Sequence, residues 1–248
     1  MPASRFFKIL DHVDSTNNYA MAQVHAGMAS HGMAWFAHNQ TAGKGQRGKD
    51  WETEPGKNIA LSLVLEPQSF NASRQFYLSA AMALACYEFF SGYAGDETKI
   101  KWPNDLYWRD RKAGGILIET VYQGSALKYA IVGIGININQ TRFSKELKNP
   151  VSLKQITGKE LDALVLAKEL YEIVMKRIEQ LKPASFEKII KEYNQYLYGI
   201  NKKVRLKKDN TIFETVIKEV NEKGQLVTVD ALERSFDFGE VEWLMASS

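Results

Sequence analysis

A short glycine-rich segment carries the residues best suited to chemistry in this chain. Residues 38–51 read HNQTAGKGQRGKDW and combine three glycines, three cations and one tryptophan. Glycines let a backbone approach a ligand closely and turn its N–H groups toward an anion. The cations add positive charge, and the ring of Trp51 offers a flat apolar face. The segment therefore predicts a loop that meets a phosphate or a carboxylate.

One common phosphate-binding pattern is excluded here. Residues 43–49 read G-x-x-x-x-G-K, but Asp50 stands where a Walker A loop has the Ser or Thr that holds Mg²⁺. The apolar run at 59–65 also predicts a strand where a P-loop requires a helix. A solvated turn between two strands is the other interpretation of the segment. It accounts for the glycines but leaves the three cations and Trp51 unexplained.

The composition is that of a soluble globular protein. The 248 residues are 45% hydrophobic and 25% charged, with a formal net charge of +3, which is lower than expected of a dedicated nucleic-acid binder. Cys86 is the single cysteine, so no internal disulfide forms and a reducing compartment is expected. The first residues do not resemble a signal peptide and no run is long enough to span a membrane. We therefore expect a cytoplasmic protein.

Hydrophobic spacing predicts strands alternating with helices, followed by a region of short strands. Strands are expected at residues 6–13, 33–38, 59–65, 99–108, 116–122 and 127–138, with a bend at Pro103 and a turn at 110–115. Helices are expected at residues 18–26, 73–93, 159–182 and 186–197. The polar residues at 14–17 are typical of a helix N-terminus. Short strands are expected at 203–207, 213–220, 226–231 and 241–244.

Two glycines fall inside a predicted strand. Gly133 and Gly135 belong to the sequence GIGIN and weaken a strand, which indicates close approach of a ligand or another backbone. The third glycine and the following helix of a dinucleotide-binding fingerprint are missing. The four histidines and Cys86 show no zinc-binding spacing. The lysines at 201–208 indicate either a nucleic-acid-binding patch or, as we favour, lysine side chains on an exposed or edge strand.

Four segments, taken in order, resemble those of biotin protein ligases. They are S-T-N at 15–17, Q-x-x-G-K-G-Q-R-G at 40–48 with Trp51, K-W-P-N-D at 101–105, and R-K-A-G-G-I-L-I-E at 111–119 leading to G-I-G-I-N at 133–137. The resemblance covers nearly the whole chain. It implies an α+β catalytic domain related to class II aminoacyl-tRNA synthetases, with a mixed β-sheet flanked by helices, over residues 1–199. A small SH3-like β-barrel is implied for residues 200–248.

The resemblance also implies a two-step reaction. Biotin and ATP would give biotinyl-5′-AMP and pyrophosphate, and the biotinyl group would then pass to a lysine of a biotin carboxyl carrier protein domain. The residues implied in biotin binding are Ser15, Thr16, Asn17, Gln40, Gly43, Lys44, Gly45, Gln46, Trp51, Lys112 and Gly115. Those implied in binding ATP or the adenylate are Arg47, Trp51, Asn104, Lys112 and Asn137.

Three residues are implied in catalysis, namely Lys112, Arg47 and Asp105. A carboxylate with a pKa near ~4.3 is already ionised at neutral pH, so adenylation needs positive charge between two anions rather than a base. Lys112 and the loop cations would supply that charge, and Mg²⁺ would arrive with ATP rather than occupy a metal site of the protein. The acceptor lysine, with a pKa near ~10.4, must lose a proton. Asp105 is the candidate base, unless it only caps the turn after Pro103.

Two departures from the family pattern matter. Lys44 and Gln46 stand where family loops often have arginines, so the bidentate fork of arginine is lost at both positions, and Arg47 would have to compensate. The first motif begins at Ser15, so we expect no N-terminal helix-turn-helix, no repressor function and no DNA partner. No membrane partner is expected, and the choice between monomer and homodimer stays open.

Two other functions were weighed. A lipoate or octanoate protein ligase would share the fold and the chemistry, but the segments KWPND and GKGQRG argue against it. A non-enzymatic nucleic-acid-binding module would use the basic C-terminal strands, and salt-dependent retention on DNA would reveal it.

Overall fold

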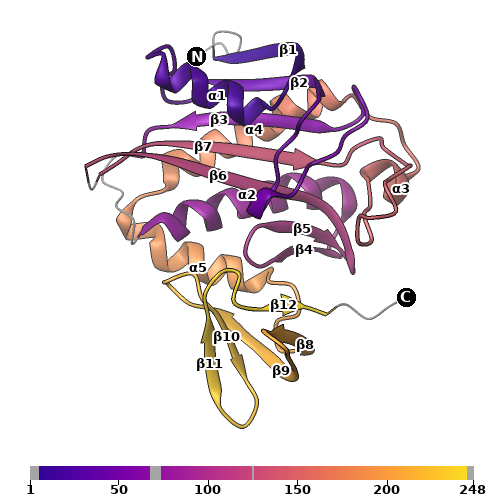
Figure 1. The fold of residues 1–248 in the computed structure, drawn as a ribbon, viewed down its shortest axis with the longest axis vertical. Helices are drawn as coiled ribbons and strands as arrows, with labels where there is room; N and C mark the ends of the chain where they lie inside the picture. The colour runs from indigo at the N-terminus through magenta and orange to yellow at the C-terminus, as the bar shows by residue number, and fades with distance from the viewer. Residues whose placement is uncertain (1–5, 68–73, 125, 245–248) are drawn as a thin grey trace.

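A seven-stranded mixed sheet forms the larger part of the molecule (Figure 1). The computed structural model describes residues 6–67, 74–124 and 126–244. Along the sheet the strand order is β1-β2-β3-β7-β6-β5-β4, in which β1 and β2 are parallel and the other pairs are antiparallel. The strands are β1 (Phe7–Val13), β2 (Ala34–Gln40), β3 (Ile59–Leu65), β4 (Thr98–Lys101), β5 (Asp105–Trp108), β6 (Arg111–Gln123) and β7 (Ala126–Ile136). The mixed sheet expected from the sequence is confirmed.

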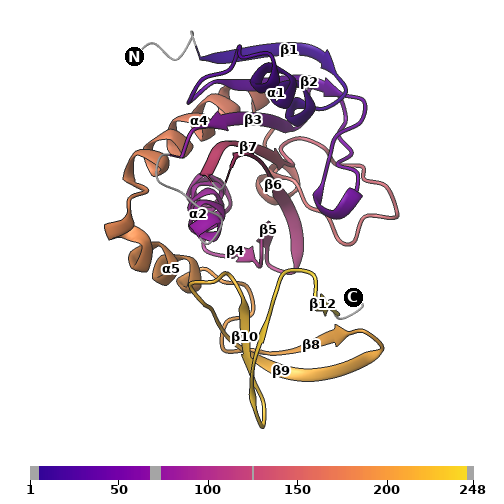
Figure 2. The same cartoon turned by 60° about the vertical axis from the view of Figure 1, so that its left-hand side comes forward.

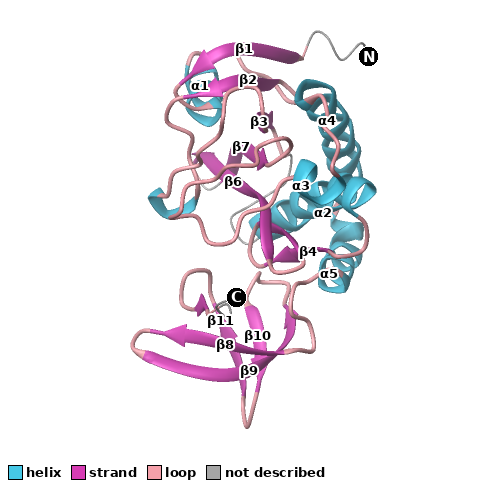
Figure 3. Cartoon of the chain, turned by 90° about the vertical axis from the view of Figure 1, so that its right-hand side faces the viewer, coloured by secondary structure: helices cyan, strands magenta, loops and turns pink. Residues whose placement is uncertain are grey.

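Helices cover both faces of this sheet. α2 (Gln75–Ala94), α4 (Ala163–Gln180) and α5 (Phe186–Gln195) lie on one side, and α1 (Thr16–His25) lies on the other (Figure 3). The predicted helix at 73–93 corresponds to α2, although Ser73 lies outside the described residues. The helix predicted at 18–26 begins two residues earlier than expected, at Thr16.

Side chains along the central strands alternate between the two faces of the large sheet, so a hydrophobic cluster forms on each face. Val132 and Ile134 of β7 join the large hydrophobic cluster beneath α2 and α4, whereas Ile131 joins a smaller cluster with α1. Successive side chains of a strand point to opposite faces, so β7 contributes to both clusters. β3 is buried along its whole length and is apolar except for Ser62. Ser62 lies on the face of the sheet that carries α1.

Two helix boundaries follow from capping. Asp162 accepts hydrogen bonds from the N–H groups of Leu164 and Val165, so α4 begins at Ala163 rather than at Lys159 as the apolar spacing suggested. α3 (Leu153–Thr157) was not predicted, because five residues are too few to show a helical period. Its capping box, formed by Ser152 and Gln155, was the available signal.

The strand predicted at 99–108 is a hairpin. β4 and β5 pair antiparallel, with Lys101 opposite Asp105. The turn predicted at 110–115 is shorter than expected, because Arg109 with a φ of 54° reverses the chain and β6 already begins at Arg111. Gly114 lies inside that strand, where a Cβ atom would come within 2.7 Å of the Gly135 carbonyl oxygen.

A second sheet follows near the C-terminus and is entirely antiparallel (Figure 2). Its strand order is β11-β10-β9-β8-β12, and within the described residues no pairing between β11 and β12 closes it into a ring. Its strands are β8 (Lys203–Lys208), β9 (Thr211–Val220), β10 (Leu226–Val229), β11 (Glu233–Phe236) and β12 (Glu242–Trp243). β11 was not predicted, since its sequence ERSF carries only one aliphatic or aromatic residue.

A buried lysine joins the two sheets. Lys101 of β4 is 9% exposed, and its Nζ lies 3.1 Å from the hydroxyl oxygen of Tyr107. The same Nζ lies 4.6 Å from the ring centroid of Tyr107 and 5.5 Å from that of Trp243 in β12. Burial lowers the pKa of Lys101 to about 8, although the charge of Asp105 opposes the shift.

This burial predicts a pH-dependent stability. Well below pH 8 the Lys101 amine is charged in the folded and unfolded states, so folding bears the whole net penalty of burying this charge, about 3 kcal/mol. Above pH 10.5 it is neutral in both states and this cost vanishes. We expect Lys101→Met to gain stability relative to the native protein at pH 7.5 and to lose that advantage by pH 10.5. Urea unfolding at both pH values measures it.

Lys99→Met is the matched control, since Lys99 lies two residues away on the same strand and is less buried. A difference between native protein and Lys101→Met that stays constant across this pH range would contradict the assignment.

Candidate active site

Strand register gathers the candidate residues on one face of the large sheet. Ser62 of β3 pairs with Gly133 of β7, and Gly133 pairs with Leu117 of β6. Gly135, Gly115 and Asp105 follow in the same way across β7, β6 and β5. Residues directly opposite each other in antiparallel strands share a face. This face, which also carries α1, is where the predicted site residues meet.

The start of α1 is tied to the end of β2. The Thr16 N–H and hydroxyl both donate to Gln40 Oε1, at 2.8 and 3.0 Å. Ser15 is the N-cap residue by position, but its side chain makes no capping hydrogen bond, so Gln40 instead satisfies one of the free N–H groups of the helix start. Ser62 Oγ lies 2.7 Å from Thr16 Oγ1 and 2.6 Å from Asn17 Oδ1. Thr16, Asn17 and Gln40, which were predicted to act together, lie together.

The two strand glycines leave room for side chains from elsewhere. A Cβ atom at Gly133 would lie 2.2 Å from Asn17 Oδ1, and one at Gly135 would lie 2.4 Å from Trp51 Cε2. Real Cβ atoms do not come this close to other heavy atoms. The glycines were expected to admit a ligand or another backbone, whereas the structure places the side chains of Asn17 and Trp51 there.

The glycine-rich loop folds back on itself. Lys44 and Asp50 form an antiparallel bridge, the Gly45 N–H donates to the Lys49 carbonyl at 2.7 Å, and the Trp51 N–H donates to the Gly43 carbonyl at 2.8 Å. Gly43 is required there, because a Cβ atom would lie 2.3 Å from the Trp51 carbonyl oxygen. The loop tip therefore projects as a narrow hairpin.

Three side chains of this hairpin reach in different directions. Gln46 Nε2 donates to the Ile116 carbonyl at 3.3 Å, and Lys44 Nζ lies 4.0 Å from Glu119 Oε1. Both contacts place the hairpin over β6. Arg47 instead contacts the segment between β11 and β12, where its Nη1 lies 3.5 Å from the Gly239 carbonyl oxygen and its guanidinium carbon 5.9 Å from the ring centroid of Phe238.

A lysine and a carboxylate form the charged centre of this face. Lys112 Nζ lies 2.7 Å from Asp105 Oδ1, and the two side chains are 34% and 26% exposed. Gly115 lies beside them, since a Cβ atom there would be 3.3 Å from Asp105 Oδ1 and 3.6 Å from Lys112 Nζ. Asn104 is adjacent, because its side-chain amide donates to the Ile116 carbonyl, the acceptor that Gln46 also uses. The residue next to Asp105 and the glycine-rich loop thus meet at one carbonyl group.

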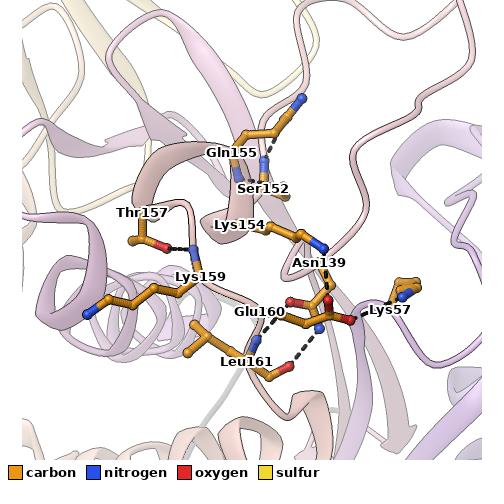
Figure 4. Close-up of polar contacts among 9 residues, drawn as sticks. All are labelled: Lys57, Asn139, Ser152, Lys154, Gln155, Thr157, Lys159, Glu160 and Leu161. Carbon is orange, nitrogen blue, oxygen red and sulfur yellow. Dashed lines mark hydrogen bonds and ion pairs between the residues drawn. The ribbon is translucent and has the colours of Figure 1, made fainter.

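Asn137 is placed differently from the other predicted residues. It is buried at the end of β7, and its Nδ2 donates to the Val151 carbonyl at 3.1 Å. Beyond it the chain is held by further polar contacts, in which Asn139 exchanges two hydrogen bonds with Leu161 and Glu160 pairs with both Lys57 and Lys154 (Figure 4). In the structure Asn137 therefore fixes the chain that leads to α3.

A cleft of about 360 Å³ opens beside the loop. Its lining consists of Gln40, Thr41, Ala42, Gly43, Asp50, Trp51, Glu52 and Thr53. Three predicted residues, Gln40, Gly43 and Trp51, thus line one cavity, and the Lys112–Asp105 pair lies outside that lining.

Two residues of this face were not predicted as site residues. Ser62 was missed although it is the single polar residue of the apolar run 59–65, which was a usable signal. Glu119 was missed although it ends the segment RKAGGILIE. In the structure its Oε2 accepts a hydrogen bond from Asn17 Nδ2 at 2.8 Å. Only the fold brings these two residues to the start of α1.

The arrangement as a whole suits the binding of anions. Lys112 and Lys44 bring positive charge to a face lined by glycine backbone, with neutral hydrogen-bonding groups at one end. Such charge can offset the repulsion between two anions held close together. In the described part of the chain no group of three or more His, Cys, Asp or Glu residues is arranged to hold a metal ion. Nor is any described helix long and apolar enough to cross a membrane.

Comparison with known proteins shows that the strands of this face belong to a segment shared by one protein family. The sequence pattern of the biotin/lipoate A/B protein ligase family matches residues 9–137, which is more than half of the chain and spans all of these strands. The chain belongs to the biotin/lipoate A/B protein ligase family. Both the glycine-rich loop and the Lys112–Asp105 pair lie within the matched segment.

Relatives of this biotin/lipoate ligase family member include bacterial proteins. The bifunctional ligase/repressor BirA of Bacillus spizizenii is 31% identical over 203 residues, covering 80% of this chain and 62% of the relative. The biotin-[acetyl-CoA-carboxylase] ligase of Paracoccus denitrificans is 35% identical over 161 residues, covering 62% of this chain and 65% of the relative. The chain thus spans less than two thirds of the length of these relatives.

A solved structure matches over almost the full length. The biotin protein ligase from Aquifex aeolicus in complex with biotin and ATP aligns with a TM-score of 0.81 and 25% identity, covering 97% of this chain and 99% of that one. The two-sheet architecture of this member of the biotin/lipoate ligase family is therefore that of a biotin protein ligase structure.

The contact between Gly135 and Trp51 yields a prediction. We expect Gly135→Ala to displace the Trp51 ring and to lower the free energy of unfolding by about 1–3 kcal/mol, the usual cost of overpacking. Chemical denaturation measures the stability, and the indole N–H resonance of Trp51 reports the displacement. Gly92→Ala in α2 is the control, because a Cβ atom there meets no heavy atom within 4 Å. An unmoved Trp51 resonance would contradict the packing described.

Proposed function

We propose that this chain is an ATP-dependent biotin protein ligase. It would join biotin to ATP as biotinyl-5′-AMP, releasing pyrophosphate, and then transfer the biotinyl group to a lysine of a biotin carboxyl carrier protein domain. The observation that carries the proposal is the Lys112–Asp105 ion pair, which lies beside the glycine-rich loop and on the same sheet face as Thr16, Asn17 and Gln40. The Aquifex aeolicus ligase, similar over 97% of this chain, was solved with biotin and ATP.

Neutral polar groups suit the ureido ring of biotin. Thr16, Asn17 and Gln40 offer hydroxyl and amide groups in a largely buried setting, next to Ser15. Such groups donate and accept hydrogen bonds without imposing a charge. We assign the biotin ring to this end of the face, with Gly43 and Gly115 allowing close approach and Trp51 covering the apolar part of the ligand.

Adenylation would take place between this end and Lys112. An oxygen of the biotin carboxylate attacks the α-phosphorus of ATP, and the bond from that phosphorus to the pyrophosphate oxygen breaks. Lys112, with Lys44, Gly45 and Gln46 of the loop, would offset the charge that gathers on the α-phosphate.

The adenylate would lie along the loop and the neighbouring strand ends. We assign Arg47, Trp51, Asn104 and Asn137 to it. Mg²⁺ would enter with the triphosphate, since it is usually held by substrate phosphates and one or two carboxylates.

The transfer step would need a group that accepts a proton, rather than positive charge that offsets two anions. The acceptor amine attacks the acyl carbon, AMP leaves with the bonding electrons, and a proton must leave the nitrogen. Asp105 is the proposed acceptor of that proton, because its carboxylate lies on the site face beside Lys112. We further propose that residues 1–199 form the catalytic domain, that residues 200–248 form a small β domain, and that the protein works in the cytoplasm.

The first test is ATP–pyrophosphate exchange by the full chain with biotin, with lipoate or with no acid. We expect exchange that depends on biotin. Exchange with lipoate alone would instead identify a lipoate ligase, and no exchange with either acid would refute both adenylation reactions.

Lys112→Ala tests the catalytic assignment. Removing a group that stabilises developing charge typically lowers a rate about 100- to 1,000-fold, and we expect biotin-dependent exchange to fall by at least that much. Lys128→Ala, an exposed lysine of β7, should leave exchange unchanged. Near-native exchange by Lys112→Ala would remove Lys112 from the mechanism.

A further inference from the structure

Glu119 contacts two parts of the proposed site at once. Its Oε2 accepts a hydrogen bond from Asn17 Nδ2 at 2.8 Å, and its Oε1 lies 4.0 Å from Lys44 Nζ. Asn17 belongs to α1 and Lys44 to the glycine-rich loop, whereas Glu119 belongs to the long strand β6. One carboxylate on the sheet therefore connects the helix start to the loop.

The carboxylate decides which way the Asn17 amide faces. Asn17 is 3% exposed, its Oδ1 lies 2.6 Å from Ser62 Oγ, and its side chain packs directly against Gly133. A hydroxyl can donate or accept, so Ser62 alone would tolerate either orientation of the amide. A carboxylate only accepts, so a flipped amide would place two oxygens against each other. Glu119 thus fixes the donor of Asn17 toward itself.

The contact with Lys44 is weaker and of a different kind. The two side chains are 45% and 31% exposed, and ion pairs this accessible to water contribute little to stability. A weak contact suits a loop that has to admit a ligand and release a product. Its partner Glu119 lies within β6 and pairs there with Ile131 of β7, so the loop is held to the sheet.

Lys44 compensates the negative charge of Glu119. The proposed substrates both bring anionic groups, and an uncompensated carboxylate beside the biotin subsite would repel them. Lys44 lies near enough to Glu119 to offset its charge, while Lys112 is paired with Asp105.

We infer that Glu119 is a positioning residue for biotin: it orients the Asn17 amide in the biotin subsite and, through Lys44, holds the glycine-rich loop over that subsite. The inference rests on the proposed function for the identity of the ligand, whereas the hold on the loop is independent of it.

Two substitutions separate the two contacts. Glu119→Gln can still accept from Asn17 through its amide oxygen, although it no longer forbids the flipped Asn17 amide, and it loses the charge that pairs with Lys44. Glu119→Ala loses both. In calorimetric titrations of the full chain with biotin, we expect Glu119→Gln to stay within about threefold of the native affinity and Glu119→Ala to lose about tenfold. Glu219→Ala, an exposed carboxylate of β9, should change nothing.

A double variant shows whether Glu119 acts through Asn17. We expect Asn17→Ala with Glu119→Ala to bind biotin no more weakly than Asn17→Ala alone. Losses that simply multiply would overturn the positioning role, because a generally loosened fold would produce them.

Amide hydrogen exchange of residues 43–51 without ligand tests the hold on the loop. We expect faster exchange in Glu119→Gln and in Lys44→Met, to the same extent, and in no other segment. Unchanged exchange in these variants would overturn the coupling to the loop. Failure of the native chain to bind biotin would refute the proposed function, and the exchange data would still decide the part played by Glu119 in the loop.

Discussion

The absence of side chains at Gly133 and Gly135 is the constraint on which the candidate site depends. These two positions of β7 face α1, and they let Asn17 and Trp51 lie directly on the sheet backbone. Any larger residue would lift α1 or the glycine-rich loop away from the strands. The loop hairpin, through Trp51, and the start of α1, through Asn17, both lie against the surface that these glycines leave flat.

Around that surface, charges are compensated in pairs. Lys112 pairs with Asp105, and Lys44 lies near Glu119. Each lysine is partly accessible to water, so an incoming anion can compete for it without a large desolvation cost. The proposed reaction, which brings a carboxylate and a triphosphate together, requires such positive charge, and Asp105 and Glu119 hold the two lysines in place.

The C-terminal sheet contacts this region at two places. Trp243 packs over the buried amine of Lys101, next to the β4–β5 turn that carries Asn104 and Asp105. The segment between β11 and β12 meets Arg47 through Gly239 and Phe238. The second sheet and its connecting segment are thus joined both to the β4–β5 hairpin and to the glycine-rich loop.

The sequence by itself determined the main elements. Apolar periodicity located β1, β2, β3, β6, β7, α2 and α5, because long amphipathic or apolar runs have few structural alternatives. Motif order led to the proposed roles of the glycine-rich loop and Lys112. Tertiary structure alone decided the register that places Ser62, Gly133 and Glu119 on one face of the sheet, since strand pairing joins residues far apart in sequence. It also decided the direction of Arg47 and the burial of Lys101, which depend on the second sheet and leave no periodic signal in the sequence.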